Sequence, residues 1–207
     1  MAGQSVKPVV VNYLGGDPEE VREAGCYPAV TLKKTAETAV RLAAKEKVGS
    51  PSVFTVNKEV IAAETRKLTA GQRFVRGLFS GGTLAYESLL ILGQPLGGIY
   101  SNLSLHPEYI LEDLYRSRCH TIIDFGEDEF TQGRLHPMID PAVRNRRIIT
   151  EAKDPETAVI MLDLVLGYNA HPDPAGAARE AIQEAKAIAA AEGPPSYGRY
   201  FSLRHRR

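Results

Sequence analysis

The sequence has only two cysteines, Cys26 and Cys119, among its 207 residues. They are too few and too far apart for a disulfide scaffold or a CxxC metal site, which excludes a small disulfide-rich secreted domain. We expect both thiols to be small apolar residues of the core in a reducing compartment.

Net charge is absent as well, because 25 Lys and Arg residues balance 25 Asp and Glu residues. The chain therefore has no overall field that would attract nucleic acid or an anionic membrane, and neither is an expected partner. The end of the sequence, RYFSLRHRR, mixes arginine with aromatic residues. We interpret it as a free end, so any function that depends on charge must be local.

Long hydrophobic runs are missing too. The longest, AVIMLDLVL at 158–166, is short and is interrupted by Asp163. The first ten residues also lack the cationic and then apolar layout of a signal peptide. These features predict a soluble cytoplasmic protein.

The first 46 residues contain two strand patterns that alternate with two helix patterns. KPVVVNYLGG (7–16) is a β-branched run that ends in glycine, and YPAVT (27–31) is a second short strand. Asp17 and Pro18 are typical of a helix start, and LKKTAETAVRLAAKEK (32–47) is amphipathic. Residues 1–46 are therefore predicted to form a βαβα unit.

A second, longer series of elements is expected at 73–191, after a linker at 47–72 that holds a possible helix at 58–68. Its predicted elements are strands in RFVRGLFS (73–80), CHTIIDF (119–125) and TAVIMLDLVL (157–166), and helices in TLAYESLLIL (83–92), DPAVRNRRIITEAK (140–153) and PAGAAREAIQEAKAIAAA (174–191). The alternation predicts an α/β fold: a flavodoxin-like parallel sheet of about five strands with helices on both faces. Residues 192–207 show no period and are predicted to be a flexible tail.

Ser80, Gly81, Gly82 and Thr83 stand between a predicted strand and a predicted helix. Such a turn aims backbone N–H groups and the positive end of a helix dipole at one point, which can bind an anion. The alternative is a tight turn that needs small residues without any ligand.

Loops that follow parallel strands meet at one edge of the sheet, where ligands bind. That edge would collect Gly15 and Gly16, the SGGT turn, and Arg134 with His136. His136 is the candidate acid–base residue, and Arg134 could bind a carboxylate or phosphate. The alternative for His136 is a structural role beside Pro137. No close ligand spacing supports a metal site, and we predict none.

Three segments together resemble a known family: RGLFSGGTLAYE (76–87), IIDFGEDEFTQGRLHPMIDP (122–141) and EAKDPETAVIMLDLVLGYNAHPDPA (151–175). With KPVVVNYLGG, they resemble the FdrA family, relatives of the α subunit of succinyl-CoA synthetase and of other ADP-forming acyl-CoA ligases. The resemblance covers most of residues 7–185 and implies a ligase-CoA-type domain. It also implies that Ser80, Gly81, Gly82 and Thr83 cradle a phosphate.

The chain departs from the synthetases at two places. Their phosphorylated histidine lies in a Gly-His-Ala-Gly loop, where this chain has Gly15, Gly16, Asp17 and Pro18. Their glutamate near the end of a later strand is replaced by Leu164, with Asp163 one place earlier, which makes Asp163 a candidate ligand-binding residue. The resemblance therefore does not imply a phosphohistidine cycle.

The order of the segments is also unusual for that family. Residues 1–46 resemble the C-terminal half of the ligase-CoA domain, and residues 73–191 resemble its N-terminal half. This is the order expected for a segment that contains the end of one tandem copy and the start of the next. We hypothesise a circularly permuted five-stranded domain; the alternative is a fragment that needs a partner. The nucleotide-type domain that holds CoA in this superfamily is missing, so we expect the chain to be inactive alone.

Three functions remain open. The first is an acyl-CoA synthetase-like subunit that binds phosphate, an acyl phosphate or a CoA-linked substrate at the SGGT turn, in an assembly with other FdrA-like or synthetase subunits. The second is a subunit of a catabolic, oxamate-type carbamoyltransferase that uses carbamoyl phosphate, with His136 as base and Arg134 on the acceptor's carboxylate. The third is a non-catalytic interaction module or gene remnant. No tightly bound cofactor is assigned.

Overall fold

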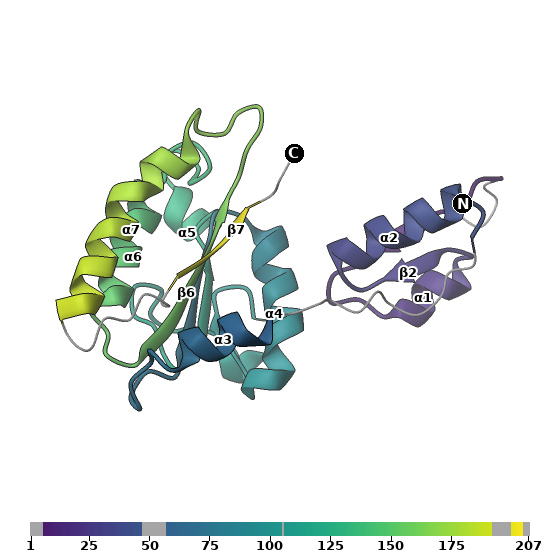
Figure 1. The fold of residues 1–207 in the computed structure, drawn as a ribbon. Coiled ribbons are helices and arrows are strands. Elements are labelled where there is room, and N and C mark those ends of the chain that lie inside the picture. Colours follow the sequence, from purple (N-terminus) through teal and green to yellow (C-terminus); the bar gives the residue numbers. More distant parts are fainter. Residues whose placement is uncertain (1–5, 47–56, 105, 192–199, 205–207) are drawn as a thin grey trace. The chain divides into compact units, whose positions relative to one another are not determined.

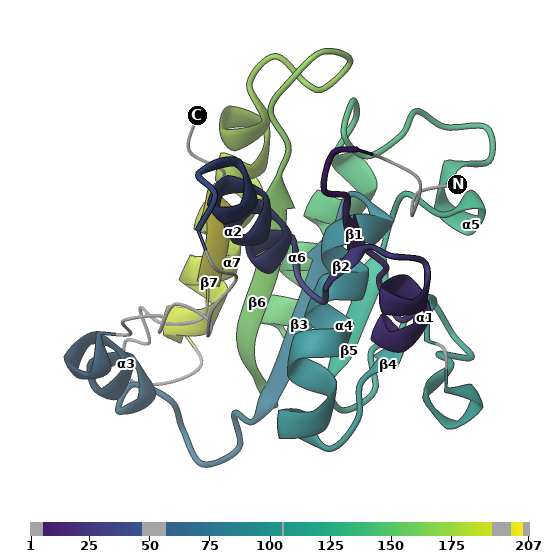
Figure 2. The ribbon, with the colours of Figure 1, turned by 90° about the vertical axis from the view of Figure 1, so that its right-hand side faces the viewer.

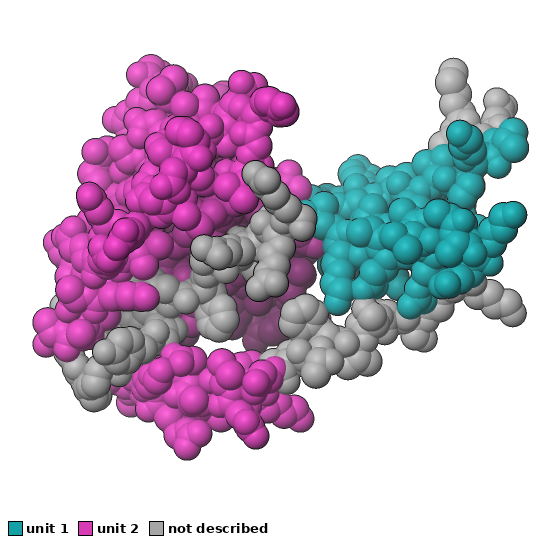
Figure 3. Space-filling model, turned by 45° about the horizontal axis from the view of Figure 1, so that its top comes forward, with its two compact units in different colours: residues 1–56 teal, residues 57–207 magenta. Residues whose placement is uncertain are grey.

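The computed structural model describes residues 6–46, 57–104, 106–191 and 200–204. The chain divides into two compact units, Met1–Val56 and Asn57–Arg207, which are coloured separately in Figure 3.

The smaller unit is a parallel two-stranded sheet with two helices. Its elements are β1 (Val10–Asn12), α1 (Pro18–Glu23), β2 (Tyr27–Ala29) and α2 (Leu32–Ala43). Asp17 caps α1 by accepting a hydrogen bond from the Glu19 amide at 2.8 Å, and Thr31 caps α2 through the Lys34 amide at 3.1 Å. These caps satisfy amides that have no partner inside a helix. The predicted βαβα order is therefore present.

The larger unit is built on one five-stranded sheet. Its elements are α3 (Lys58–Thr65), β3 (Phe74–Phe79), α4 (Gly82–Leu96), β4 (Tyr100–Ser101), the 3-10 helix η2 (Pro107–Tyr109), β5 (Thr121–Asp124), α5 (Asp128–Thr131), α6 (Ala142–Ala152), β6 (Thr157–Leu164), α7 (Pro174–Ala191) and β7 (Tyr200–Arg204). The strand order is β4-β5-β3-β6-β7, and every neighbouring pair is parallel (Figures 1 and 2). None of the described helices is both long and apolar enough to cross a bilayer.

Side chains that alternate along the strands build a separate core on each face of this sheet. Leu78 and Ile123 belong to one core together with Ile148 of α6, whereas Phe79 and Ile122 belong to the other. Residues of α7 complete the first core, and residues of α4 complete the second. This period of two is the pattern of a strand buried on both faces. The structure thus confirms an α/β fold with parallel strands and helices on both sides.

The structure differs from the permuted single sheet that we hypothesised from the sequence. β1 and β2 pair with each other in a sheet of their own. The position beside β6 is held by β7, which pairs from Ile160↔Tyr200 to Leu164↔Arg204. Residues 200–204, which form β7, lie in the segment that we predicted to be a flexible tail. Unpaired backbone groups at the edge of β6 favour any strand that can reach them.

The prediction that both cysteines are buried was wrong for one of them. Cys26 is buried, but Cys119 is exposed, with a φ of 47°. Because β5 begins only at Thr121, Cys119 lies in the turn before the strand rather than inside the sheet.

A cluster of buried charges lies near the start of β3. Arg76 is 2% exposed, and its guanidinium donates to Glu151 at 2.9 Å and to Asp154 at 2.6 Å. Glu151 also accepts from Arg147 and Ser117. Burial alone would raise the pKa of Asp154, but its hydrogen bond from the backbone of Glu156 and the positive charge of Arg76 hold that pKa below its usual value. These contacts allow charges to remain inside the domain.

Candidate functional site

The candidate site lies where β3, β5 and β6 end. The strands are parallel, so their carboxyl ends reach the same edge of the sheet. Ser80 directly follows β3, Asp124 is the last residue of β5, and Asp163 is next to last in β6. Three polar side chains that are distant in the sequence therefore meet at this edge.

A buried hydrogen-bond network fixes the SGGT turn to β6. The Ser80 amide donates to the Asp163 carboxylate at 2.8 Å. The Arg144 guanidinium donates to the Ser80 hydroxyl, to the Asp163 carbonyl at 2.8 Å and to the Asp163 carboxylate at 3.0 Å. All three residues are 2% exposed. Asp163, a predicted ligand-binding residue, is placed as the partner of Arg144 and of the turn.

Arg144 was not predicted as a site residue. Burial lowers the pKa of its guanidinium, while the charge and hydrogen bonds of Asp163 oppose that shift. Its Nε is buried without a hydrogen-bond partner in the described part of the chain. The signal in the sequence was helical spacing, since Arg144 stands four residues before the core residue Ile148 and so shares its face of α6.

The first backbone amides of α4 are open. Gly81 is the N-cap residue, with an extended φ of −167° and no side-chain capping bond. Among the described residues, no hydrogen bond is recorded from the backbone N–H of Gly81, Gly82 or Thr83. Helix termini leave such donors unsatisfied, and they favour a negative group together with the helix dipole. The predicted anion cradle thus has three free donors, while the Ser80 amide is already used.

Asp124 is the carboxylate beside this helix start. Its Oδ2 lies 3.1 Å from the position that a Cβ on Gly82 would occupy. Its Oδ1 accepts the Gly126 amide at 2.7 Å, and Asn102 holds its backbone through two hydrogen bonds. Burial raises the pKa of Asp124 to about 6; the Gly126 amide and His136 lower it, and the charges of Glu127 and Asp163 raise it. Asp124 can therefore exist as a neutral acid near neutral pH.

His136 reaches the same place from the loop after β5. Its Nδ1 accepts a hydrogen bond from the Met138 amide at 3.2 Å, so the neutral imidazole carries its proton on Nε2. A Cβ on Gly126 would lie 2.8 Å from that Nε2 and 3.0 Å from the Asp124 carboxylate. Glycine at 126 therefore leaves room for the histidine and the aspartate side by side. With Nδ1 occupied and the proton on Nε2, the neutral ring offers a hydrogen-bond donor at this edge rather than a free base.

The remaining predicted residues are Arg134, in the loop of His136, and Gly15 and Gly16, in the smaller unit. Arg134 is exposed in the same loop as His136, and no contact of its guanidinium is recorded among the described residues. Gly15 and Gly16 belong to the smaller unit, where the Gly16 amide donates to the Tyr13 carbonyl at 3.1 Å. A Cβ on Gly16 would lie 2.1 Å from the Tyr13 ring, so the close approach of that ring explains the glycine. The proposed ligand roles of these three residues remain predictions.

The sequence profile of CoA-ligase matches residues 78–195, which include the SGGT turn, Asp124, His136, Arg144 and Asp163. The chain belongs to the CoA-ligase family. Membership supports the succinyl-CoA synthetase-like superfamily that the motifs indicated, and the matched range corresponds to the larger unit with its parallel sheet. In this CoA-ligase chain, the cluster at the sheet edge thus lies inside the family domain.

The uncharacterized protein YahF of Escherichia coli (strain K12) is similar to this chain. The two are 46% identical over 187 residues, which cover 90% of this chain and 36% of YahF. The chain thus spans about a third of the length of that curated relative.

Proposed function

We propose that this chain is a subunit or segment of an FdrA-type, acyl-CoA synthetase-like enzyme. The α4 start would bind phosphate, an acyl phosphate or the phosphate end of a CoA-linked substrate. The observation that carries the proposal is the open N-terminus of α4: its first three amides have no hydrogen-bond partner among the described residues, and Asp124 and His136 lie beside them. The other parts of the reaction, including binding of CoA, would come from further subunits of the assembly.

The residues around the cradle would have separate roles in the reaction. The amides of Gly81, Gly82 and Thr83 would bind the phosphoryl oxygens. The hydrogen bonds that Arg144 and Asp163 make would hold the turn in place. A neutral Asp124 would donate a hydrogen bond to the anion, whereas an ionised Asp124 would repel it. His136 would donate a hydrogen bond from Nε2–H to the bound anion, and the exposed Arg134 would bind an acceptor's carboxylate.

Carbamoyl transfer is the second candidate function. One observation favours it: the turn formed by Gly15, Gly16 and Asp17 leads directly into α1 and contains no histidine, whereas His136 lies beside the phosphate cradle. A reaction in which carbamoyl phosphate reacts directly with an acceptor requires no phosphorylated enzyme. Carbamoyl phosphate that binds more tightly than phosphate and CoA in calorimetry would favour this reading. A chain that binds none of them would be an interaction module.

Replacing Gly81 with aspartate is expected to abolish anion binding while it stabilises the protein. Nothing lies within 4 Å of a Cβ at Gly81, and its extended φ suits any residue. The new carboxylate would cap the free amides itself and add about 0.5 kcal/mol of stability. Isothermal calorimetry with phosphate and acetyl phosphate should show at least a roughly tenfold loss of affinity.

The matched control is Gly71→Asp, which adds the same charge to the same unit. A Cβ on Gly71 has only the Pro155 carbonyl near it, at 3.9 Å. This variant should bind phosphate like the wild type. Wild-type affinity in the Gly81→Asp protein would show that the α4 start is not the anion site.

A further inference from the structure

A cavity of about 430 Å³ lies on α4, away from the residues of the anion cradle. One wall is formed by Tyr86, Leu89, Leu90, Gly93 and Gln94 of the helix. Cavities of roughly 300–1,000 Å³ that are lined mainly by apolar and aromatic groups are the usual form of small-molecule sites. The lining of this cavity contains no Lys, Arg, Asp or Glu.

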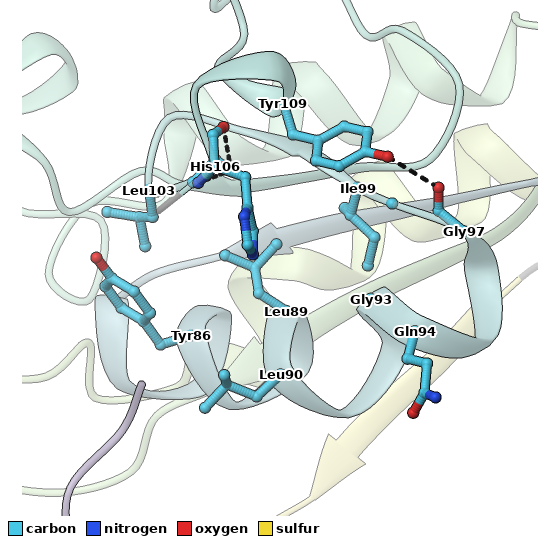
Figure 4. Close-up of a pocket in the computed structure, with 12 residues that line it drawn as sticks. Tyr86, Leu89, Leu90, Gly93, Gln94, Gly97, Ile99, Leu103, His106 and Tyr109 are labelled. Carbon is cyan, nitrogen blue, oxygen red and sulfur yellow. Dashed lines mark hydrogen bonds between the residues drawn. The ribbon is translucent and has the colours of Figure 1, made fainter. Parts of the chain in front are cut away.

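The opposite wall is held in place by its own contacts. The Tyr109 hydroxyl donates to the Gly97 carbonyl at 3.1 Å, and the Tyr109 ring stands edge to face with Tyr100 at 5.6 Å between centroids. A Cβ on Gly98 would lie 2.2 Å from the Tyr109 ring, so glycine is required there. Figure 4 shows Ile99 on this wall and the dashed bond from Tyr109 to Gly97. The wall is therefore formed before any ligand arrives.

The floor of the cavity is a helix residue without a side chain. Gly93 lies inside α4, where glycine is destabilising relative to alanine. Nothing lies within 4 Å of a Cβ at this position, so no neighbouring side chain requires the glycine. Its effect is to deepen the cavity down to the helix backbone.

Three polar groups point to what the cavity would accept. Tyr86, Gln94 and His106 are among the lining residues, and no side-chain hydrogen bond of these three is recorded among the described residues. In Figure 4 the His106 ring extends from its loop toward Leu89. Apolar walls, aromatic edges and a few free hydrogen-bonding groups suit a flat, uncharged ring that carries a polar substituent.

The geometry points to a second ligand site in this protein: the cavity that α4 forms with Leu103, Ser104, His106 and Tyr109 binds a small, uncharged aromatic molecule of one or two rings. The absence of lysine and arginine from the lining disfavours carboxylates and phosphates inside it. The site is therefore chemically distinct from the anion cradle at the start of α4, and its occupant is not the phosphate of the proposed reaction.

The test is an NMR titration of the full chain, labelled with ¹⁵N. Phenol and benzoate, which share one aromatic ring and differ in charge, are added in separate titrations. Phenol should shift the amide signals of Gly93, Gly97 and Ile99 saturably, with a Kd on the order of 1 mM. Benzoate should bind at least about tenfold more weakly, because its carboxylate has no partner there. Sulfate should not displace phenol.

Gly93→Leu should fill the floor and abolish the phenol shifts, while Gly93→Ala should weaken binding less. Both variants should melt at or above the wild-type Tm, because the space is empty and the helix propensity improves. Ala187→Leu, which introduces the same side chain at an exposed position of α7, is the control and should bind phenol like the wild type. Unchanged binding in Gly93→Leu, or no saturable shifts, would overturn the proposal.

A protein partner is the competing occupant, because Leu90 and Ile91 on the same helix are 43% and 51% exposed. Sedimentation of the wild type and of Gly93→Leu separates the two cases. We expect both the wild type and Gly93→Leu to be monomers. A wild-type dimer that Gly93→Leu dissociates would assign the cavity to a subunit interface and contradict the small-molecule site.

Discussion

Replacing Arg76 with methionine is expected to lower the free energy of unfolding by about 3–5 kcal/mol, the usual cost of leaving buried charges without their partner. Arg76 is 2% exposed and pairs with both Glu151 and Asp154. Without it, Glu151 keeps only Arg147 and Ser117 as partners, and Asp154 loses one of the groups that lower its pKa. Urea denaturation at neutral pH would measure the difference.

Arg73→Met is the matched control for this prediction. Arg73 also pairs with a glutamate, Glu156, but the two side chains are 64% and 45% exposed. Exposed pairs contribute about 0–1 kcal/mol, so this variant should unfold almost like the wild type. Equal losses for Arg73→Met and Arg76→Met would contradict the role assigned to burial.

Sulfate binding at the α4 start is expected to weaken by up to about fifty-fold between about pH 6 and about pH 8. Burial raises the pKa of Asp124 to about 6, so the neutral acid makes up about half of the molecules at the lower pH and about 1% at the higher. Only the neutral form accepts an anion beside it without repulsion. Sulfate is the better probe because, unlike phosphate, its own charge does not change in this range.

Asp124→Asn should bind sulfate with little dependence on pH, because an amide can still accept the Gly126 N–H but cannot ionise. Asp128→Asn removes an exposed acid at the start of α5 and should keep the wild-type pH profile. A pH profile that Asp124→Asn leaves unchanged would assign the titration to another group.

The same pKa has a consequence for stability. The folded-state pKa of Asp124 is raised, so its contribution to stability is present at low pH and is lost as the pH rises through about 6. Asp124→Asn is therefore expected to be more stable than the wild type at about pH 8, with no such gain at low pH. Thermal melts at the two pH values test this.

The regular elements could be predicted because their signals are local. The alanine-rich helix was expected at 174–191 and is observed as Pro174–Ala191, since Asp173 and Pro174 mark its start. The strand expected at 157–166 is observed as Thr157–Leu164. β4 has only two residues, which is too short for any period, and β7 depends on pairing with β6. Such elements exist through tertiary contacts that a single sequence does not display.

The site was only partly predictable for the same reason. The SGGT turn and His136 could be selected from residue type and from the resemblance. That Asp124 stands between them follows from the register of β3 and β5, in which Phe79 lies beside Asp124. Arg144 is one of three arginines in its helix, and the sequence alone does not show that it turns inward to Asp163. Side-chain direction at the sheet edge was the missing information.

The all-parallel sheet described above also determines how fast this protein acquires its structure. β3 lies at the centre, and its partners are residues 121–124 and 157–164, so a growing chain makes β3 long before either partner exists. Topologies dominated by such non-local pairs fold slowly, and their hydrophobic strands stay unpaired and exposed for longer. We therefore expect refolding from urea to be slow and prone to aggregation at high concentration, and a chaperone that shields β3 during synthesis to raise the yield of folded protein.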